Sequence, residues 1–360
     1  MRSAVVVGTG LIGTSVALAL NAQGVRVHLR DVDPAAARIA ASRGAGVTEP
    51  QDGPVDLAVM AVPPALVGSV LADVQAHNLA EHYTDVASVK AGPQEDVLSF
   101  ACRTSRYIGG HPMAGGERSG PFAARADLFE GRTWVLTPTA DTSTETLNTA
   151  LELVALCGAT PVVMGAVEHD RAVGLVSHTP HLVASLVALR LEQAEERAVS
   201  LAGQGIRDLT RVAGGDPDLW VDILSANASV VADILEELAL DLDDAVAGLR
   251  ALAATDEAKR GEGRRTVRQL LSRGRAGRGR IAGKRGTPTV RYRTVGVLIG
   301  DQPGQLARLF TDADRSGVNI EDVRLEHSAG QLAGLVHLSV DQRSTTVLEE
   351  ALRANGWRVQ

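Results

Sequence analysis

The sequence is poor in aromatic residues and in cysteine, and each shortage excludes a class of protein. Only 3% of the 360 residues are aromatic, so the hydrophobic cores must be built from alanine, valine and leucine. The two cysteines, Cys102 and Cys157, lie far apart and in no motif, which argues against a disulfide framework and suits a reducing compartment. No apolar run approaches the ~20 residues of a membrane span. A core-like apolar run begins at Ala4, which leaves no room for a signal peptide, so we expect a cytoplasmic protein.

Charge is unevenly distributed along the chain. The net charge of −7 favours solubility and argues against a general affinity for nucleic acid. Residues 259–285 nevertheless hold eleven Lys or Arg against one acid, Glu262. No aromatic residue is interleaved with these charges, as base stacking on nucleic acid would require. Because residues 261–289 are rich in Arg and Gly with little apolar periodicity, we interpret them as a mobile basic linker.

The remaining apolar patterns indicate three folded domains. Over residues 1–163, apolar runs of strand length alternate with helical patterns, which predicts an α/β domain with a doubly wound parallel sheet. The expected strands there are 4–7, 25–29, 57–62, 84–86, 107–109, 133–136 and 161–163, and the expected helices are 11–22, 35–43 and 144–157.

The second and third domains differ in their periodicity. Residues 164–260 carry helical spacing with little that resembles a strand, which predicts an all-helical domain. Its expected helices are 167–200, 204–213, 217–239 and 241–260. Residues 290–360 follow the order β-α-β-β-α-β of a ferredoxin-like split unit.

A glycine-rich turn opens the first domain, directly after the first expected strand and at the start of the first expected helix. Gly8 permits the tight turn, Gly10 lets the backbone approach a pyrophosphate, and Gly13 packs helix on strand, while free N–H groups at the helix N-terminus receive the phosphate. The pattern predicts a Rossmann-type dinucleotide site. We expect it to include Gly8, Thr9, Gly10, Leu11, Ile12 and Gly13.

An acidic residue ends the second expected strand. Asp31 follows Gly13 by 18 residues, where a carboxylate accepts a hydrogen bond from the ribose 2′-hydroxyl and repels a 2′-phosphate. The sequence therefore favours NAD over NADP, although Arg30 offers a partner for a phosphate and Asp33 is a second candidate for the ribose. Two residues at the end of the third expected strand lie at the carboxyl edge where ligands bind in open sheets, and we add them to the cofactor site: Val62 and Pro63.

The segment 109–120 sets one histidine, His111, among glycines, a proline, an acid and a base. Such a segment packs poorly as core, and a cofactor domain of this kind needs a proton acceptor beside the cofactor. Upstream, the stretch 85–90 reads DVASVK and carries Ser88, a small hydrogen-bond donor near the expected nicotinamide end. The helical half adds His169-Asp170, Ser177-His178-Thr-Pro-His181, Arg207-Asp208-Leu-Thr-Arg211 and Trp220.

In this order, over residues 1–225, these motifs resemble the prephenate dehydrogenase family of tyrosine biosynthesis. The resemblance implies that the chain oxidises prephenate, or its amino-acid counterpart arogenate, with NAD. Hydride leaves the ring carbon that bears the hydroxyl, CO2 is lost, and a phenol results. By resemblance His111 is the base for the hydroxyl proton, a role that suits a neutral imidazole. Ser88 is implied to hydrogen-bond near His111 and the substrate hydroxyl, and Asp170 to support the histidine network.

The resemblance also assigns residues to the substrate. Arg211 is implied to bind the ring carboxylate with its planar guanidinium. Asp208 lies three residues earlier on the same helix face and is expected to orient Arg211, while Arg207 is the alternative anion binder. Trp220 is implied to close the pocket, although a tryptophan there is as readily explained as core.

The histidine cluster across Pro180 is implied to lie at the substrate entrance. Ser177, His178 and His181 would need a further partner to hold a metal, and the sequence offers none, so we expect no metal. A keto-acid side chain suits the imidazole of His181, whereas the ammonium group of arogenate requires a nearby acid, which Glu117 would supply. We therefore expect prephenate, with arogenate as the alternative.

The last domain carries a second resemblance. Asp301-Gln-Pro-Gly follows its first expected strand, and Ser-Gly-Val-Asn319-Ile follows its first expected helix. These stretches resemble the ACT family of amino-acid-sensing domains, and the resemblance implies tyrosine as feedback effector; the alternative is a dimerisation module without a ligand. The implied effector residues are Asp301, Pro303, Gly304, Leu306, Asn319 and Ile320.

Two other functions compete with this interpretation. NAD-dependent dehydrogenases of similar architecture that act on 3-hydroxy acids or sugar acids use a lysine in the helical domain, and no Lys occurs between Lys90 and Lys259. A non-catalytic sensor of NAD and amino acids would bind NAD and reduce none. The small residues of the helical domain allow close helix packing, and we expect a homodimer that binds neither nucleic acid nor a membrane.

Overall fold

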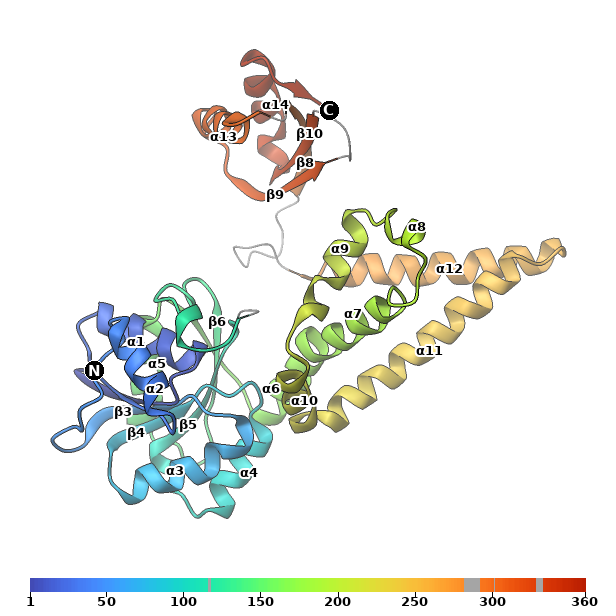
Figure 1. Cartoon of the computed structure of the whole chain (residues 1–360). Helices are drawn as coiled ribbons and strands as arrows, with labels where there is room; N and C mark the ends of the chain where they lie inside the picture. Colours follow the sequence, from blue (N-terminus) through green and yellow to red (C-terminus); the bar gives the residue numbers. More distant parts are fainter. Residues whose placement is uncertain (116–117, 282–291, 301, 328–332) are drawn as a thin grey trace. The chain divides into compact units, whose positions relative to one another are not determined.

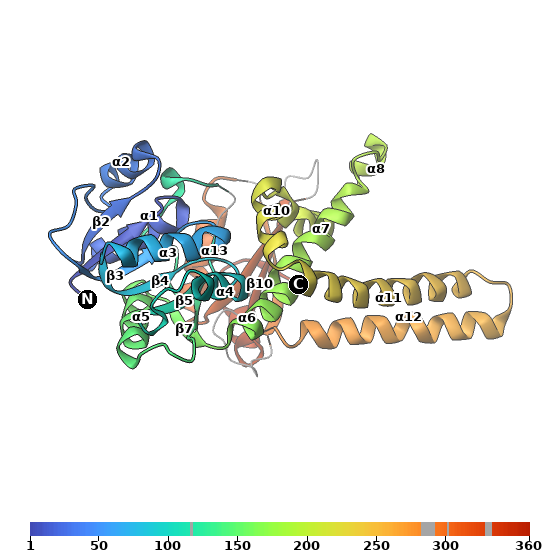
Figure 2. The same ribbon diagram turned by 90° about the horizontal axis from the view of Figure 1, so that it is seen from below.

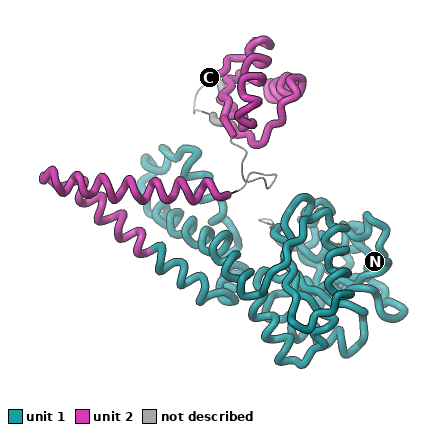
Figure 3. Tube along the Cα trace, turned by 180° about the vertical axis from the view of Figure 1, so that it is seen from behind, with its two compact units in different colours: residues 1–238 teal, residues 239–360 magenta. Residues whose placement is uncertain are grey.

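The structure is a computed structural model that describes residues 1–115, 118–281, 292–300, 302–327 and 333–360 (Figure 1). The chain divides into two compact units, Met1–Leu238 and Ala239–Gln360 (Figure 3). The division falls within one long helix, α11 (Ala228–Leu252).

A seven-stranded sheet forms the centre of the first unit. Its strands are β1 (Ser3–Val7), β2 (Arg26–Arg30), β3 (Val55–Met60), β4 (Ala80–Asp85), β5 (Tyr107–Pro112), β6 (Thr133–Thr137) and β7 (Thr160–Val163). They lie in the order β2-β1-β3-β4-β5-β6-β7. The predicted parallel sheet is present from β1 to β5 and needs correction beyond it, because β6 runs antiparallel to β5 and parallel to β7. Only a parallel neighbour requires a crossover helix. The chain instead passes from β5 to the antiparallel β6 through residues 113–132, which include the end of the glycine-rich segment 109–120.

Helices cover both faces of this sheet (Figure 1). One face carries α1 (Leu11–Ala22), α2 (Pro34–Ser42) and α5 (Thr144–Leu156), where Leu20 and Leu153 pack into a buried cluster with Val6. The other face carries α3 (Val67–Ala76) and α4 (Ala91–Ser99), where Leu71 packs near Val5. Each fully buried leucine stabilises the fold by about 1.5–3 kcal/mol. The sequence patterns did not predict α3 and α4.

Between β7 and the end of α11 the polypeptide is almost entirely helical. The helical turns and helices are α6 (Ala166–Val173), η4 (Gly174–His178), α7 (Thr179–Leu189), α8 (Glu196–Val199), α9 (Gln204–Thr210), η5 (Arg211–Gly214), α10 (Pro217–Ala226) and α11. The turn η4 is π-helical, a geometry that is often found at functional sites. The expected helices 217–239 and 241–260 need correction, because the break falls at Asn227 and no residue near position 240 interrupts α11.

The run from α6 to α7 corrects another expectation. Residues Ala166–Leu189 form one helix that is long and apolar enough to cross a membrane, with a mean hydropathy of 1.5 in its most apolar window. This test uses length and composition alone, and the core helix of a soluble protein also passes it. The buried polar side chains of His169, Asp170, His178 and His181 lie on this run.

The basic segment is a helix over most of its length. We predicted a mobile linker over 261–289, but α12 (Glu257–Arg278) occupies 261–278, and residues 282–289 lie outside the described part of the chain. Asp256 caps α12 by accepting a hydrogen bond from the Lys259 N–H at 3.1 Å. A Cβ on Gly263 would meet the backbone of Gly248 on α11, so both glycines permit close contact between the two helices. Composition suggested disorder, whereas arginine and leucine are good helix formers.

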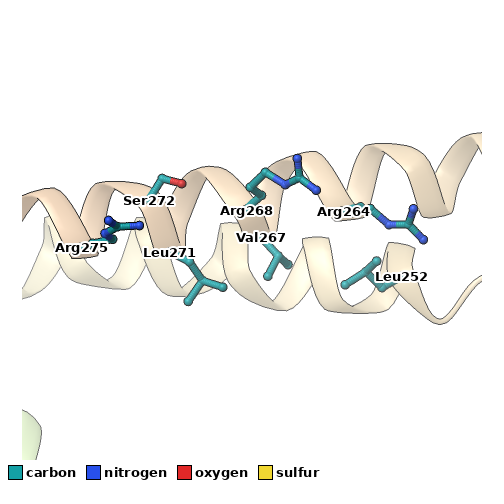
Figure 4. Close-up of a pocket in the computed structure, with 7 residues that line it drawn as sticks. All are labelled: Leu252, Arg264, Val267, Arg268, Leu271, Ser272 and Arg275. Atoms are coloured by element: carbon teal, nitrogen blue, oxygen red, sulfur yellow. The ribbon is translucent and has the colours of Figure 1, made fainter.

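The two helices form an antiparallel hairpin (Figure 2). Arg273 of α12 forms an ion pair with Asp241 of α11 at 3.2 Å. A surface hollow of about 410 Å³ lies on this hairpin (Figure 4), lined by Leu252, Arg264, Val267, Arg268, Leu271, Ser272 and Arg275.

The rest of the second unit has the predicted β-α-β-β-α-β order. Its elements are β8 (Tyr292–Gly300), α13 (Gln305–Arg315), β9 (Ile320–His327), β10 (Ala333–Asp341), α14 (Thr345–Ala354) and β11 (Arg358–Val359). The strands form an antiparallel sheet in the order β11-β8-β10-β9. Residues of β8 and β10 pack against Leu309 and Leu348 of the two helices in a separate buried cluster.

Candidate active site

The glycine turn between β1 and α1 has the geometry that a dinucleotide requires. Gly8 has a φ of +97°, and a Cβ there would collide with the carbonyl oxygen of Ala61. A Cβ on Gly13 would collide with the carbonyl oxygen of Gly8, so helix α1 and the turn approach closely. A Cβ on Gly10 would meet nothing within 4 Å, which leaves an open side to the turn. Gly10 is the N-cap of α1 without a side-chain hydrogen bond, so the first N–H groups of α1 remain available to a phosphate.

Asp31 is fixed directly beside this turn. Its Oδ2 accepts hydrogen bonds from the Thr9 N–H at 2.6 Å and the Thr9 hydroxyl at 2.7 Å, and its Oδ1 accepts from the Asp33 N–H at 2.9 Å. Burial alone would raise the pKa of Asp31, but these hydrogen bonds and one from the Val32 backbone outweigh it, so the pKa is lowered. Because Oδ2 already accepts two hydrogen bonds from Thr9, a ribose hydroxyl would bind at Oδ1.

The side chains of Arg30, the alternative partner for a phosphate, and Asp33, the second candidate for the ribose, each form a hydrogen bond elsewhere. Arg30 donates to Oε1 of Gln51 at 3.0 Å, and the carboxylate of Asp33 caps α2 by accepting from the Ala35 N–H at 2.8 Å. The turn, the uncapped helix end and Asp31 together fit NAD. Val62 and Pro63 follow β3, with Val62 partly buried and Pro63 exposed.

A chain of three polar side chains begins at His111, the last residue but one of β5. Nδ1 of His111 lies 2.8 Å from Nε2 of His169 on α6, and Nδ1 of His169 lies 2.7 Å from Oδ1 of Asp170. Because a carboxylate only accepts, the proton of a neutral His169 resides on its Nδ1 and its Nε2 accepts in turn. His111 then donates from Nδ1, which leaves its Nε2 unprotonated. The arrangement makes Nε2 of His111 a proton acceptor.

Backbone N–H groups hold the carboxylate of Asp170 in place. Its two oxygens accept hydrogen bonds from the Lys90 and Ala91 N–H groups, both at 2.8 Å, at the N-terminus of α4. A helix N-terminus stabilises negative charge through its free N–H groups and its dipole. The carboxylate that we predicted to support the histidine network is therefore at the end of that network, and its partner His169 is a residue for which we predicted no role.

The pKa of His111 is lowered well below its usual value. Burial is the largest cause, followed by the neighbouring His169, Lys90 and His178, each of which opposes a positive charge on His111. His111 is therefore neutral near pH 7, as a general base must be.

A buried ion pair lies beneath the His111 segment. Lys90 is fully buried and pairs with Asp85, and its ammonium also donates to the carbonyl oxygen of Gly110 at 2.6 Å. Asp85 further accepts from the Tyr107 hydroxyl at 2.7 Å. A Cβ on Gly110 would meet the Asp85 carbonyl oxygen, so the glycine before His111 is needed for this packing. We predicted no role for Lys90, and only its place in the motif 85–90 pointed to it.

The helical side of the site contains a second aromatic and histidine cluster. The rings of His181 and Trp220 are stacked, with centroids 3.5 Å apart and planes at 14°. The ring of His178 meets Trp220 edge-on at 6.4 Å. Ser177 of the same run is partly buried. Trp220 is thus placed against both histidines that the sequence assigned to the substrate entrance.

Several predicted residues are not brought into contact with His111. The hydroxyl of Ser88 makes no hydrogen bond with any described residue, and its predicted role stays a prediction. Arg207 and Arg211 are exposed and form no ion pair with a described residue, while η5, which begins at Arg211, packs against α7. Asp208 accepts from Gln204 at 2.8 Å and does not contact Arg211 through a hydrogen bond. Glu117 lies outside the described residues.

The remaining predictions concern a metal site and the effector residues of the second unit. Among the described residues no group of three or more His, Cys, Asp or Glu side chains is arranged to hold a metal. In the second unit, Gly304 directly precedes α13 as its N-cap with a φ of +86°, and Leu306 packs against the buried cluster of the C-terminal sheet domain. Asp301 lies outside the described residues, and Pro303 lies in the turn before α13. A surface hollow of about 410 Å³ is lined by Phe310, Asp314, Gly317, Val318, Asn319 and Ile320.

Comparisons with known proteins agree with this geometry. Residues 16–163 match the family described as prephenate dehydrogenase, nucleotide-binding domain, and residues 165–258 match prephenate dehydrogenase, dimerization domain. The probable prephenate dehydrogenase NovF of Streptomyces niveus is 40% identical over 359 residues, which cover 99% of each chain. The prephenate dehydrogenase of Bacillus subtilis is 32% identical and covers 66% of this chain and 67% of its own.

Solved structures give the same result. The prephenate dehydrogenase of A. aeolicus, in complex with hydroxyphenyl propionate and NAD+, is 27% identical with a TM-score of 0.66, covering 78% of this chain and 99% of its own. The arogenate dehydrogenase of Synechocystis is 25% identical with a TM-score of 0.61, covering 76% and 99%. The chain belongs to the prephenate dehydrogenase family and is an NAD-dependent oxidoreductase.

Proposed function

We propose that the chain oxidises prephenate with NAD+ to 4-hydroxyphenylpyruvate, CO2 and NADH, as a step of tyrosine biosynthesis. The observation that carries this proposal is the chain His111–His169–Asp170, which leaves one imidazole nitrogen free to accept a proton. The family match and the NAD-fitting turn at residues 8–13 support it. Arogenate, whose oxidation would give tyrosine directly, is the alternative substrate, and relatives with both names match this chain.

Different residues of the cofactor site bind the pyrophosphate and the ribose of NAD+. NAD+, when bound, accepts the hydride from the ring carbon that bears the hydroxyl. The free N–H groups at the start of α1 would donate hydrogen bonds to the pyrophosphate beside Gly10, and the carboxylate of Asp31 would accept one from the ribose hydroxyl. Since Asp31 is anionic and held by Thr9, it disfavours a 2′-phosphate. We assign to this site Gly8, Thr9, Gly10, Leu11, Ile12, Gly13, Asp31, Val62 and Pro63.

His111 moves the proton. Its Nε2 accepts the proton of the substrate hydroxyl as hydride departs, and the positive charge that forms is shared along the hydrogen bond to His169. The carboxylate of Asp170, which two backbone N–H groups hold in place, stabilises that charge. Loss of CO2 follows and is driven by aromatisation. Ser88 is proposed to orient the hydroxyl.

Substrate binding is assigned to the helical side. Arg211 is proposed to bind the ring carboxylate, with Asp208 beside it. His181, held flat against Trp220, faces the three-carbon side chain together with Ser177. Burial lowers the pKa of His181, and a neutral imidazole suits a keto acid. Glu117 is the acid that would favour arogenate.

Measuring NADH formation with prephenate and with arogenate at fixed NAD+ tests the proposal. We expect a higher kcat/KM for prephenate. A higher value for arogenate would reverse the substrate assignment, and no NADH with either would favour a protein that binds NAD without turnover. The variant His111→Asn should lose about 10²-fold or more of kcat if His111 is a general base, while its affinity for NAD+ should not change.

The C-terminal sheet domain is proposed to bind tyrosine as a feedback effector. Its β-α-β-β-α-β order and the hollow that includes Asn319 and Ile320 support this assignment. The proposed effector residues are Asp301, Pro303, Gly304, Leu306, Asn319 and Ile320.

The helical hairpin is proposed to be part of a homodimer contact. Along α11, residues 235, 238, 242, 245, 249 and 252 are Leu or Ala at the 3-4 spacing of a coiled-coil seam. Leu242 is 62% and Leu249 57% exposed in the single chain, and the matched family domain is named for dimerization. Leu242→Glu should therefore convert a dimer into a monomer in light scattering, whereas Asp243→Glu should not.

A further inference from the structure

Asn227 occupies a position that neither the sequence motifs nor the family resemblance pointed to. It lies at the junction where α10 ends and α11 begins, and its side chain is buried. Its amide Nδ2 donates to the backbone carbonyl oxygen of Asp170 at 2.8 Å and lies 3.1 Å from Nδ1 of His178. One amide group therefore connects the backbone of Asp170, the last residue of the His111–His169–Asp170 chain, to a second histidine.

The two contacts together fix the protonation of His178. The Asp170 carbonyl only accepts, so the atom that faces it must be the NH2 group of Asn227. The same NH2 group faces Nδ1 of His178, which must therefore accept and carry no proton. A neutral His178 then holds its proton on Nε2, and that N–H makes no hydrogen bond with any described residue. Protonating Nδ1 would set an N–H against an NH2 group, which is unfavourable.

The surrounding packing holds both partners in this arrangement. His178 ends the π-helical turn η4 and is almost fully buried. A Cβ on Gly174 would come within 2.8 Å of Val230 and 3.4 Å of Nδ2 of Asn227, so η4 lies directly against α11. Trp220 of α10 meets the His178 ring from another side.

The surroundings of His178 lower its pKa and so favour a neutral ring. Burial is the largest cause; Asp170 acts in the opposite direction and raises the pKa, while His169 lowers it. His178 in turn lies close enough to His111 to lower the pKa of that base.

We propose that Asn227 is a positioning residue that keeps His178 neutral with its proton on Nε2, so that His178 presents a hydrogen-bond donor to an oxygen atom of the bound acid. The two histidines of the site then hold opposite tautomers. His111 offers an unprotonated Nε2 as base, and His178 offers a protonated Nε2 as donor. This role rests on the proposed function, because the acceptor is an oxygen of its acidic substrate.

The first test needs no turnover. In protein with 15N-labelled histidine rings, the His178 signals, assigned by their loss in His178→Gln, should show a proton on Nε2 and a bare Nδ1 at neutral pH. In Asn227→Asp the carboxylate should draw the proton to Nδ1 and raise the pKa of the ring. The proposal is overturned if wild-type His178 carries its proton on Nδ1 or is charged at neutral pH. Because the spectra do not depend on activity, this outcome is distinct from a failure of the proposed reaction.

The second test uses kinetics and a double-mutant cycle. Asn227→Asp should lower kcat/KM for prephenate about tenfold, the value of one lost hydrogen bond to a charged or polar oxygen. The loss should be largest at pH values where the His178 ring of Asn227→Asp is neutral, because its proton then lies on Nδ1 and Nε2 cannot donate. In a His178→Gln background, Asn227→Asp should lower kcat/KM for prephenate little further than His178→Gln alone does.

The control is Asn21→Asp, because Asn21 also donates from Nδ2 to a backbone carbonyl, that of Gly44 at 2.8 Å, at the far end of α1 from the cofactor turn. It should leave the spectra and the pH profile of the wild type unchanged. An equal loss from Asn227→Asp with and without His178 would show that Asn227 acts through Asp170 and would overturn the proposal.

Discussion

Nδ1 of His111 and Nε2 of His169 lie 2.8 Å apart, with their rings edge to face at 72°. The two residues are 58 positions apart in the sequence and belong to β5 of the sheet and α6 of the helical part. The contact joins the α/β half and the helical half of the first unit at the proposed site of proton transfer. Any change in how α6 packs against the sheet therefore alters the base itself.

Replacing the middle residue of this chain tests the relationship. His169→Gln should lower kcat about 10²-fold, within the usual contribution of general base catalysis, because a glutamine amide can accept from Nδ1 of His111 but cannot share the positive charge that forms on it. The KM for NAD+ should change little, since His169 does not contact the glycine turn. Steady-state kinetics with prephenate measure both constants.

The matched control for this substitution is His77→Gln, because His77 is exposed and pairs with Asp73 away from the site. It should retain wild-type kcat. If His169→Gln retains it as well, the hydrogen bond between the two histidines has no part in catalysis.

Features that depend on neighbouring residues in the chain were predictable from the sequence, whereas features that depend on distant contacts were not. The turn at residues 8–13 and Asp31 were predictable because strand, turn and helix are consecutive in the chain. The direction of β6 was not predictable, because an apolar run has the same pattern whichever way the strand runs. The helix α12 was missed because its arginine and glycine content suggested disorder, whereas its contact with α11 at Gly248 depends on the fold.

The same distinction applies to the site. His111 and Asp170 were assigned through motifs, but the order of their contacts depends on how α6 meets β5. Lys90 and Asn227 contribute through burial and through a backbone carbonyl, and no spacing in the sequence reports either property. Polar residues whose role is to hold another residue are the ones that pattern reasoning overlooks.

The pH dependence of the reaction follows from the lowered pKa of His111. His111 must be neutral to accept a proton, so kcat/KM should rise with pH along one limb and then level off. Because burial, His169, Lys90 and His178 lower the pKa, the midpoint of that limb should lie below about 6.5, the ordinary value for histidine. A profile of kcat/KM from about pH 5 to pH 8 measures it, and a midpoint above the ordinary value would contradict the assignment.

The same shift makes stability depend on pH. Between the folded pKa and the ordinary value, the unfolded chain binds the proton on His111 and the folded chain does not. Unfolding then takes up protons, so the free energy of unfolding falls as pH decreases below about 6.5. His178 and His181, whose pKa values are also lowered, contribute with the same sign. Urea titrations at several pH values measure the free energy of unfolding. This free energy should change less steeply with pH in His111→Asn than in the wild type.

Lys90→Met should destabilise the fold strongly. The pair with Asp85 is fully buried, and removal of one partner leaves an uncompensated charge, at a cost of about 3–5 kcal/mol. An exposed pair, Arg106 with Glu81 at 3.2 Å, provides the control, and Arg106→Met should cost about 0–1 kcal/mol. Urea unfolding midpoints compare the two. Adding Asp85→Asn to Lys90→Met should recover part of the loss, and a Lys90→Met variant as stable as Arg106→Met would show that the pair contributes little.

The C-terminal sheet domain should make the enzyme sensitive to tyrosine. Deleting residues 286–360 removes all of β8 to β11 and leaves every proposed catalytic and cofactor residue in place, so kcat should persist while inhibition by tyrosine disappears. In the full-length chain, Asn319→Ala changes a residue that lines the hollow beside α13 and should raise the tyrosine concentration that halves the rate, with kcat unchanged in its absence. Glu349→Gln lies on α14 away from that hollow, where Glu349 pairs with Arg353, and should respond to tyrosine as the wild type does. Equal sensitivity of the full-length and shortened proteins would place the inhibitory site in the catalytic part, where tyrosine resembles the phenolic product and would compete with prephenate.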